Sequence, residues 1–448
     1  MKSFGYLPAT QDDRAYMLSK LGLTSTDQLF ADIPEGVKLG RALQLPESAS
    51  ELTLMHELNQ LSGKNVPVDE ATSFLGAGAY HHYIPSAVDA IVSRSEFYTS
   101  YTPYQPEISQ GMLQAIFEYQ TLVARLYGME AANASLYDGQ TAVGEAALMA
   151  ASHTRKNRIV TSTTVHPESR AVLSVYTRGQ SVQVDEVDHQ GGIMTVEALE
   201  AAMTDDTAAV LIQYPNFFGQ LEDVRKIAQV AHEKGALLIV SANPIAMGLL
   251  EAPGVFGADI VVGEGQSLGN SLSYGGPYVG ILATTKELLR KIPGRIVGMT
   301  KDGQDRRGFV LTLQAREQHI RREKASSNIC SNQALNALAA SVYLGYMGKN
   351  GLREVANLCL QKAHYAARKF AQVGAKIAFT NKFFHEFVID LGDRAQAIMT
   401  TLTNENIFLG YALGDAYPSL QGHVLVAVTE VISKEQIDHV AERLGELL

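Results

Sequence analysis

The sequence predicts an α/β protein whose core is a mostly parallel β-sheet. Several short, nearly continuous apolar runs lie between about residues 158 and 285, as expected of strands that are buried on both faces. Helical patterns separate most of these runs, and strands that alternate with helices form βαβ units. The chain has 448 residues, of which 46% are hydrophobic, enough for about two or three domains with a sizeable core.

The first expected elements are short helices in residues 1–65, which we expect to form an arm on the main body. Thr10 is the expected N-cap of the first helix, because Asp13 completes a capping box three residues later. A helix at about 140–156 begins after Gly139. The strands expected after it are RIVTST (158–163), VQVDEV (182–187), AAVLIQYP (208–215), ALLIVSA (236–242), DIVVGEG (259–265) and YVGILATT (278–285).

A smaller α+β part is expected after the sheet. The last two strands are joined by only a short glycine-rich loop, which predicts one antiparallel strand. Helical stretches at about 330–348 and 351–373 follow, then shorter strands and a closing helix capped by Ser433 and Gln436. The expected divisions are an N-terminal helical arm (1–65), a large α/β domain (66–329), and a long linking helix with a small C-terminal α+β domain (330–448).

Composition and charge exclude several classes of protein. The net charge of −10 is unfavourable for general nucleic-acid binding. No apolar run is long enough to span a bilayer and no signal-peptide core is seen, so we expect a cytoplasmic protein without a membrane partner. Cys330 and Cys359 are expected to be buried thiols. The adjacent His81 and His82 cannot chelate a metal from one helix face, and no metal site is predicted.

The stretch DIVVGEGQSLGNSLSYGGPYVGIL, residues 259–282, reads as a strand, a Gly/Ser-rich loop, a tight turn and a second strand. It is similar to the stretch that carries the Schiff-base lysine in large α/β pyridoxal enzymes, where an acid on the preceding strand pairs with the pyridinium nitrogen. Here Ser241 takes the place of the acid, and Gln266 to Leu268 take the place of the lysine. The sequence predicts a cofactor frame without its nucleophile. The alternative is two strands of an unrelated α/β protein.

The run LYDGQTAVGEAAL places Gly139, Gln140 and Thr141 at the start of a helix. Helix N-termini bind anions through free N–H groups and the helix dipole, so this turn is a candidate, degenerate phosphate cup. The alternative is that Asp138 or Thr141 only caps the helix.

The run EFYTSYTPYQPEISQGMLQ, residues 96–114, places three tyrosines and two prolines close together. Tyrosine supplies contact area and a hydroxyl at low entropic cost, so this segment suits an interface or a pocket wall. An ordered surface loop is the alternative.

The run AREQHIRREKASSNIC, residues 315–330, mixes Arg321, Arg322 and Lys324 with acidic residues. Mixed charges at helical spacing are typical of a solvated face. A site for an anion or an acidic partner is the alternative.

Four longer runs carry a resemblance to a known family: FLGAGAYHHYIPS, YTPYQPEISQGMLQ, ANASLYDGQTA and LQAREQHIRREKASSNIC. Nearly end to end, the chain resembles the glycine decarboxylase P-protein family of the glycine cleavage system, in the form of subunit 1 (the α subunit) of the split type. That subunit is similar to the N-terminal half of the long single-chain form. The resemblance implies a type I pyridoxal-phosphate-enzyme fold, similar to aspartate aminotransferase.

The resemblance also implies partners and a reaction. In the α2β2 assembly that the resemblance implies, the β subunit (subunit 2) would carry the lysine and the pyridoxal phosphate, and this chain would hold no covalent cofactor. The assembly would decarboxylate glycine and transfer the aminomethyl group to the lipoyl arm of the H-protein. This chain would complete the partner's active site and be inactive alone. A catalytically silent scaffold or regulatory pseudoenzyme of the same fold is the alternative, and the missing lysine argues against a self-contained transaminase or lyase.

Two groups of residues receive roles from this resemblance. The residues expected to face the partner's cofactor are Tyr98, Tyr101, Tyr104, Gln105 and Glu107. The residues expected to contact anionic groups or the H-protein surface are Arg321, Arg322 and Lys324.

Overall fold

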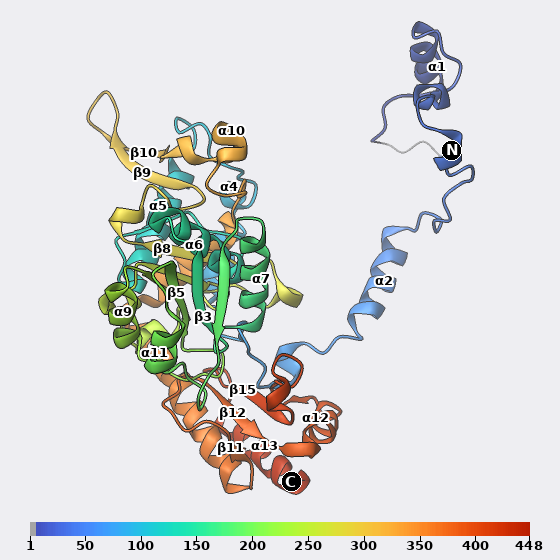
Figure 1. The fold of residues 1–448 in the computed structure, drawn as a ribbon. Coiled ribbons are helices and arrows are strands. Elements are labelled where there is room, and N and C mark those ends of the chain that lie inside the picture. The colour runs from blue at the N-terminus through green and yellow to red at the C-terminus, as the bar shows by residue number, and fades with distance from the viewer. Residues whose placement is uncertain (1–5) are drawn as a thin grey trace. The chain divides into compact units, whose positions relative to one another are not determined.

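The computed structural model describes residues 6–448 and divides into two units, residues 6–65 and residues 66–448 (Figure 1). The first five residues of the expected arm lie outside the described residues. The first unit contains helices α1 (Gln11–Lys20) and α2 (Glu51–Ser62) joined by short 3-10 turns. The capping box of Thr10 and Asp13 is present as predicted. No residue from 6 to 65 is buried, so this unit has no core of its own.

A seven-stranded sheet forms the centre of the second unit, in the order β2-β8-β7-β6-β5-β3-β4 (Figure 1). Neighbours from β7 through β4 pair in parallel, whereas β8 is antiparallel to both β7 and β2. The expected antiparallel strand is therefore confirmed. The strands are β2 (Ala131–Ala132), β3 (Arg158–Ser162), β4 (Gln183–Val187), β5 (Thr207–Tyr214), β6 (Leu237–Ala242), β7 (Ile260–Glu264) and β8 (Gly280–Thr284).

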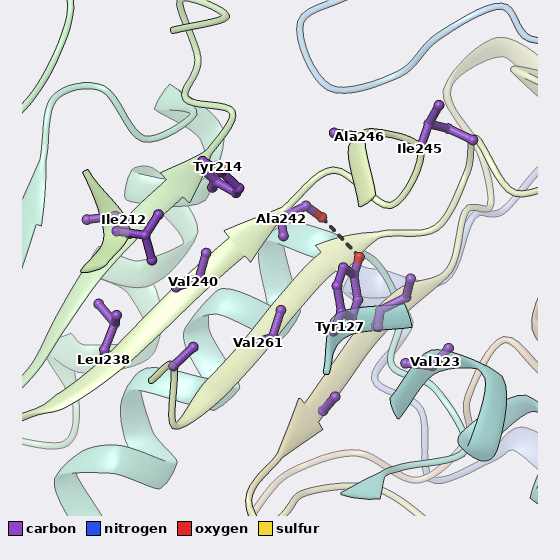
Figure 2. Close-up of a cluster of buried hydrophobic side chains, with 14 of the residues drawn as sticks. Val123, Tyr127, Ile212, Tyr214, Leu238, Val240, Ala242, Ile245, Ala246 and Val261 are labelled. Atoms are coloured by element: carbon purple, nitrogen blue, oxygen red, sulfur yellow. Dashed lines mark hydrogen bonds between the residues drawn. The ribbon is translucent and has the colours of Figure 1, made fainter. Parts of the chain in front are cut away.

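Helices cover both faces of this sheet because alternate strand residues point to opposite sides. Ile239 of β6 packs in the layer that contains α6, whereas its neighbours Leu238 and Val240 pack in the layer that contains α5, α9 and α11. Figure 2 shows the second layer, in which the Tyr127 hydroxyl donates to the Ala242 carbonyl at 3.0 Å. The helices are α3 (Ser86–Val92), α4 (Ser95–Tyr98), α5 (Gln110–Tyr127), α6 (Gly139–Thr154), α7 (Pro167–Arg178), α8 (Val196–Ala202) and α9 (Val224–Glu233).

The C-terminal part is a smaller α+β layer. Helix α11 (Ala334–Gln372) replaces the two expected helices, and Gly348, with a φ of 56°, interrupts its helical geometry near the expected break. A four-stranded sheet follows in the order β11-β12-β15-β14. Its strands are β11 (Lys376–Ile377), β12 (Glu386–Asp390), β14 (Tyr411–Ala412) and β15 (His423–Ala427). The helices of this layer are α12 (Ala395–Thr403) and α13 (Lys434–Leu447). A further short strand, β13 (Ile407–Phe408), pairs in parallel with β1 (Thr72–Ser73). The capping box at the start of α13 is confirmed.

Two features differ from the sequence analysis. An antiparallel hairpin of β9 (Ile296–Lys301) and β10 (Arg307–Thr312), followed by the single-turn helix α10 (Gln318–Arg321), was not predicted. The prediction that Cys330 is buried is wrong: Cys330 is exposed because α11 begins after it, whereas Cys359 is buried inside α11 as expected. Within residues 6–448, no helix combines the length and the apolar character needed to cross a membrane.

Candidate functional site

A cavity of about 60 Å³ lies at the carboxyl ends of the parallel strands. Ser241 of β6 and Glu264 of β7 reach it from the sheet, Gly139 reaches it from the first turn of α6, and Glu386 of β12 closes it from the smaller layer. Ligands of open α/β sheets bind at this edge. Residues of the predicted cofactor frame therefore line one cavity, built by segments that are far apart in the sequence, and its assignment as a cofactor site stays a prediction.

The carboxylate of Glu264 fills the anion position of this cavity. It accepts hydrogen bonds from the backbone N–H of Gly139 at 2.9 Å, of Gln266 at 3.0 Å and of Val279 at 3.1 Å. Burial raises the pKa of Glu264 to about 7, and these donors act in the opposite direction. Gly139 permits the contact, since a Cβ there would lie 3.0 Å from the Glu264 side chain. A side chain of this protein thus stands where a phosphate would bind the helix N-terminus.

A second carboxylate takes another donor of the same helix turn. Asp138 is the N-cap of α6, and its Oδ1 accepts from the Thr141 backbone N–H at 2.7 Å and from the Thr141 hydroxyl at 2.9 Å. Gly139 and Gln140 line the cavity, whereas Thr141 does not. Asp138 therefore caps the helix, which is the alternative that the sequence left open. The Thr141 hydroxyl of the expected phosphate cup donates to this cap.

Gln266 carries no nucleophile, and its side-chain amide binds the backbone of the segment around Tyr80. Its Oε1 accepts from the Tyr80 backbone N–H at 2.9 Å, and its Nε2 donates to the carbonyls of Tyr80 at 3.1 Å and Asn270 at 2.8 Å. Only 2% of Gln266 is exposed. Ser267 lines the cavity, and Leu268 is fully buried in the core. A lysine ammonium cannot accept a hydrogen bond, so it could not replace this amide.

The opposite wall is also built from groups that are already paired. Glu386 accepts from the Tyr80 hydroxyl and from the Ala77 backbone N–H, both at 2.9 Å. Burial raises the pKa of Glu386 to about 7 and lowers the pKa of His385 to about 3. The Tyr80 ring packs on His385 with centroids 4.6 Å apart. The carboxylate of this wall is thus paired within the chain, whereas the buried Nδ1 of His385 has no hydrogen-bond partner among the described residues.

Pyridoxal phosphate does not fit this cavity. No lysine and no arginine is among the residues that line it. Its anion position is taken by Glu264, and its volume is about one fifth of the roughly 300 Å³ at which small-molecule sites begin. The Ser241 hydroxyl is present at the rim, and its assignment to the position of the acid stays a prediction. In this chain the frame of the site is kept and its space is filled.

The sequence is similar along nearly its whole length to a known protein family. The model of the family described as glycine cleavage system P-protein matches residues 5–444. The chain belongs to the glycine cleavage system P-protein family. A probable glycine dehydrogenase (decarboxylating) subunit 1 from Geobacillus kaustophilus is 54% identical over 441 residues, 98% of each chain. A protein with the same description from Bacillus mycoides is 52% identical over 442 residues, 99% of each chain.

Solved structures agree with this membership. The crystal structure of a glycine decarboxylase (P-protein) in inhibitor-bound form has a TM-score of 0.90 at 40% identity and covers 99% of this chain and 100% of that chain. A cysteine desulfurase from Thermococcus onnurineus has a TM-score of 0.65 at 16% identity, with 87% and 97% covered, and shares the fold. A C-DES mutant described with glycine linked to its PLP cofactor has a TM-score of 0.61 at 15% identity, with 87% and 98% covered. The expected family, fold class and enzyme, glycine dehydrogenase (decarboxylating), are confirmed.

The predicted pocket-wall residues of this P-protein chain lie outside its own cavity. Tyr104 is 58% exposed and Tyr101 is 74% exposed. The Tyr104 ring lies 5.6 Å from the Arg295 guanidinium, which also approaches its hydroxyl at 3.5 Å. The whole set of Tyr98, Tyr101, Tyr104, Gln105 and Glu107 is exposed. Its contact with a partner's cofactor stays a prediction.

The basic residues separate into two groups. Arg321 and Lys324 line a second cavity, and Arg322, which lies between them in sequence, does not.

Sequence reasoning considered His82 only as the neighbour of His81 and predicted no metal site, whereas the structure places His82 in a buried cluster with Cys359 and Glu430. His82 Nδ1 lies 2.6 Å from Glu430 Oε2, and the Cys359 thiol lies 3.4 Å from the same oxygen. One potential ligand atom from each residue lies within 4.8 Å of the others. In the described structure these atoms are joined by hydrogen bonds, which hold the 74–85 segment against the smaller layer.

Three site residues were missed by the sequence analysis: Tyr80, Glu264 and Glu386. Glu264 had a detectable signal, because a carboxylate that directly ends a buried strand needs partners. Glu386 had none, since its contact with Tyr80 joins residues that are 306 positions apart.

Proposed function

We propose that this chain is the non-lysine (α) subunit of glycine dehydrogenase (decarboxylating) and that it completes the active site of its β subunit. The observation that supports the proposal is the filled cavity: Glu264 accepts from the Gly139 backbone, and Gln266, in the segment predicted to replace the lysine, is bonded to Tyr80. A chain of this fold that cannot take the cofactor still has a function if it supplies one wall of its partner's site. The name subunit 1 of its relatives supports a partner subunit.

The partner would hold the pyridoxal phosphate, which supplies the electron sink for the loss of carbon dioxide from glycine. The part of this chain in the reaction is to help bind and orient the substrate and to exclude water from the partner's site. The exposed segment from Tyr98 to Glu107 offers rigid aromatic surface and three phenol groups. Covered by the partner, these groups would wall the glycine site and the entrance for the lipoyl arm of the H-protein.

The assembly we propose is an α2β2 heterotetramer that works in the cytoplasm. Arg321, Arg322 and Lys324 are the residues proposed to contact anionic groups or the H-protein surface. All three are exposed, which supports a role in contacts outside this chain.

A silent scaffold of the same fold is the second candidate. The filled cavity supports a chain without its own cofactor in both readings, and the exposed tyrosines from Tyr98 to Tyr104 are what favour a role in the partner's site. The two candidates differ in whether the segment from Tyr98 to Glu107 reaches the partner's cofactor.

The first experiment is a titration of the purified chain with pyridoxal phosphate, read by visible absorption, alone and with the β subunit. We expect no band of bound cofactor from the chain alone, a band with the partner, and a change of that band on addition of glycine. A stoichiometric band from the chain alone, fixed by borohydride to one of its own lysines, would contradict the proposal. A β subunit that turns over glycine equally fast without this chain would favour the scaffold.

A further inference from the structure

A second cavity, of about 600 Å³, lies toward the other end of α6. Glu145 and Ser152 of α6 form part of one wall. The remaining walls include five cationic residues together with Asn157, Gln180, Val182, Pro293, Ala325 and Ser326. The first cavity touches α6 at Gly139, in the first turn, so the two cavities contact different parts of one helix. None of the groups that fill the first cavity takes part in the second.

The second cavity has an excess of positive charge that composition does not predict. Its cationic lining residues are Arg290, Lys291, Arg316, Arg321 and Lys324. Across the described residues, 6–448, none of these five forms an ion pair with a carboxylate. The chain as a whole carries a net charge of −10, so carboxylates are abundant elsewhere. Unpaired cations that converge on one recess indicate a site that attracts anions.

The acidic group in the lining does little to neutralise these cations. Glu145 is buried, and its carboxylate accepts from the Ser327 hydroxyl at 2.7 Å. Burial raises the pKa of Glu145 to about 7. Near neutral pH this carboxyl is partly protonated, and the field in the cavity is set by the cations.

Arg316 gives the cavity a rigid donor. Its two terminal nitrogens donate to the carbonyls of Ile292 and Gly294, the latter at 2.6 Å. Its Nε is buried and has no hydrogen-bond partner. A guanidinium that is fixed in this way contributes its positive charge to the cavity at little further entropic cost. The other four cations are exposed, and two of them are held by hydrogen bonds: Lys291 donates to the Ser152 hydroxyl at 3.3 Å and Arg321 donates to the Ala315 carbonyl at 3.2 Å.

We propose that this cavity binds a small polyvalent anion, of the phosphate-ester or polyphosphate class. Its volume of about 600 Å³ lies within the range of small-molecule sites, roughly 300–1,000 Å³. Arg and Lys together with the Ser152 hydroxyl are the donors that phosphate oxygens need. A recess of this size favours a small ligand over the flat acidic surface of a protein. Arg321 and Lys324 are shared with the contacts proposed above, but the inference rests on the second cavity and its cations and uses no residue of the cofactor-type cavity.

The test is isothermal titration calorimetry of the full chain with inorganic pyrophosphate, with orthophosphate as the less charged comparison. We expect one site per chain, with tighter binding of pyrophosphate and a strong dependence on salt. Arg321→Gln and Lys324→Gln should each weaken binding about ten-fold, the loss of one charge-assisted hydrogen bond. Arg322→Gln is the matched control and should leave the Kd unchanged, because Arg322 lies between them in sequence but outside the lining.

Several results would overturn the proposal. One is the absence of heat at millimolar pyrophosphate, and another is equal weakening by all three substitutions, which would mean only diffuse attraction. A third is complete displacement of pyrophosphate when the β subunit is added, which would assign these cations to carboxylates of the partner. Glu264→Gln checks the location, since it should not change the Kd if the ligand is in the second cavity. Because the function proposed above is read by visible absorption of the cofactor, the two proposals can fail separately.

Discussion

The polar groups of the cavity at the strand ends are buried and bonded within the chain, whereas those of the segment from Tyr98 to Glu107 are exposed. In the cavity, Glu264, Gln266 and Glu386 are buried and hydrogen-bonded within the chain. In the segment, the tyrosine side chains are exposed to between 58% and 74%. Buried polar groups must be satisfied internally, whereas exposed ones are free to meet another molecule. The difference teaches that this chain has given up its own ligand site and kept a surface that can serve another site.

The largest expected effect comes from restoring the lysine. Gln266→Lys removes the acceptor of the Tyr80 N–H and buries an ammonium group, so we expect a loss of about 2–4 kcal/mol in the free energy of unfolding. We also expect no covalent pyridoxal phosphate, because Glu264 still fills the anion position. Urea unfolding and visible absorption measure the two outcomes.

Ser271→Lys, an exposed lysine in the same loop, is the control and should change stability by less than about 0.5 kcal/mol. A Gln266→Lys chain that is as stable as the parent and binds the cofactor would contradict the comparison, because the cavity would then have space for a ligand.

The next effect concerns the carboxylate that takes the place of phosphate. Glu264→Gln presents an amide to three backbone donors, and we expect a loss of about 1–3 kcal/mol at pH 5. The folded-state pKa of Glu264 is raised to about 7 from 4.5. The parent's stabilisation from this group is therefore complete below about pH 4.5 and is lost as the pH rises through 7. The deficit of the variant should shrink between pH 5 and pH 8.

Urea midpoints of parent and variant at several pH values provide the measurement. Glu354→Gln, on the exposed side of α11, serves as the control and should show no such trend. A deficit that grows with pH would mean that the charged carboxylate is the stabilising form.

A smaller effect is expected from the exposed segment. Tyr101→Phe or Tyr104→Phe should lower the rate of the assembled enzyme about five-fold, the equivalent of one hydrogen bond. The complex itself should remain intact in size-exclusion chromatography, because the rings are kept. Tyr346→Phe changes a similarly exposed tyrosine of α11 and should leave the rate unchanged. Unchanged kinetics in both segment variants would remove these residues from the partner's site.

The smallest effect sharpens the boundary of the exposed region. Cys330 is exposed and Cys359 is buried, so a thiol reagent should modify only Cys330 in the native chain and both after unfolding. The Cys330 carbonyl accepts from Arg295, which also contacts Tyr104. If the partner covers this region, the β subunit should slow the modification of Cys330. Cys330→Ser should change stability by less than about 0.5 kcal/mol, and equal labelling rates with and without the partner would place the interface elsewhere.

The sequence predicted the parts of the structure that local rules determine. The six main strands, the antiparallel step and the capping boxes of Thr10 and Ser433 were predicted, because periodicity and cap chemistry act within a few residues. The β9–β10 hairpin was missed although its strands contain the apolar runs IVGM and FVL, because only the ends of the strands near the core are buried and the ends near the turn are exposed.

The candidate site was predicted only in outline. The absence of a lysine and the turn at Gly139 could be read from the chain, but the groups that fill the space could not. Glu386 and Tyr80 meet only through folding, across 306 positions. Arg290 and Lys291 join Arg321 and Lys324 around one recess for the same reason.

The carboxylate of Glu264 has a consequence for how the loop after β7 can evolve. It receives a hydrogen bond from Gln266 at the start of that loop and another from Val279 at its end. A single side chain therefore joins the start and the end of the loop. The turn around Tyr274, which is 91% exposed, takes no part in these hydrogen bonds. The turn can drift in length and composition while the strands on either side stay in register. An epitope or fluorophore tag inserted at this turn should therefore leave the pairing of β7 and β8 unchanged.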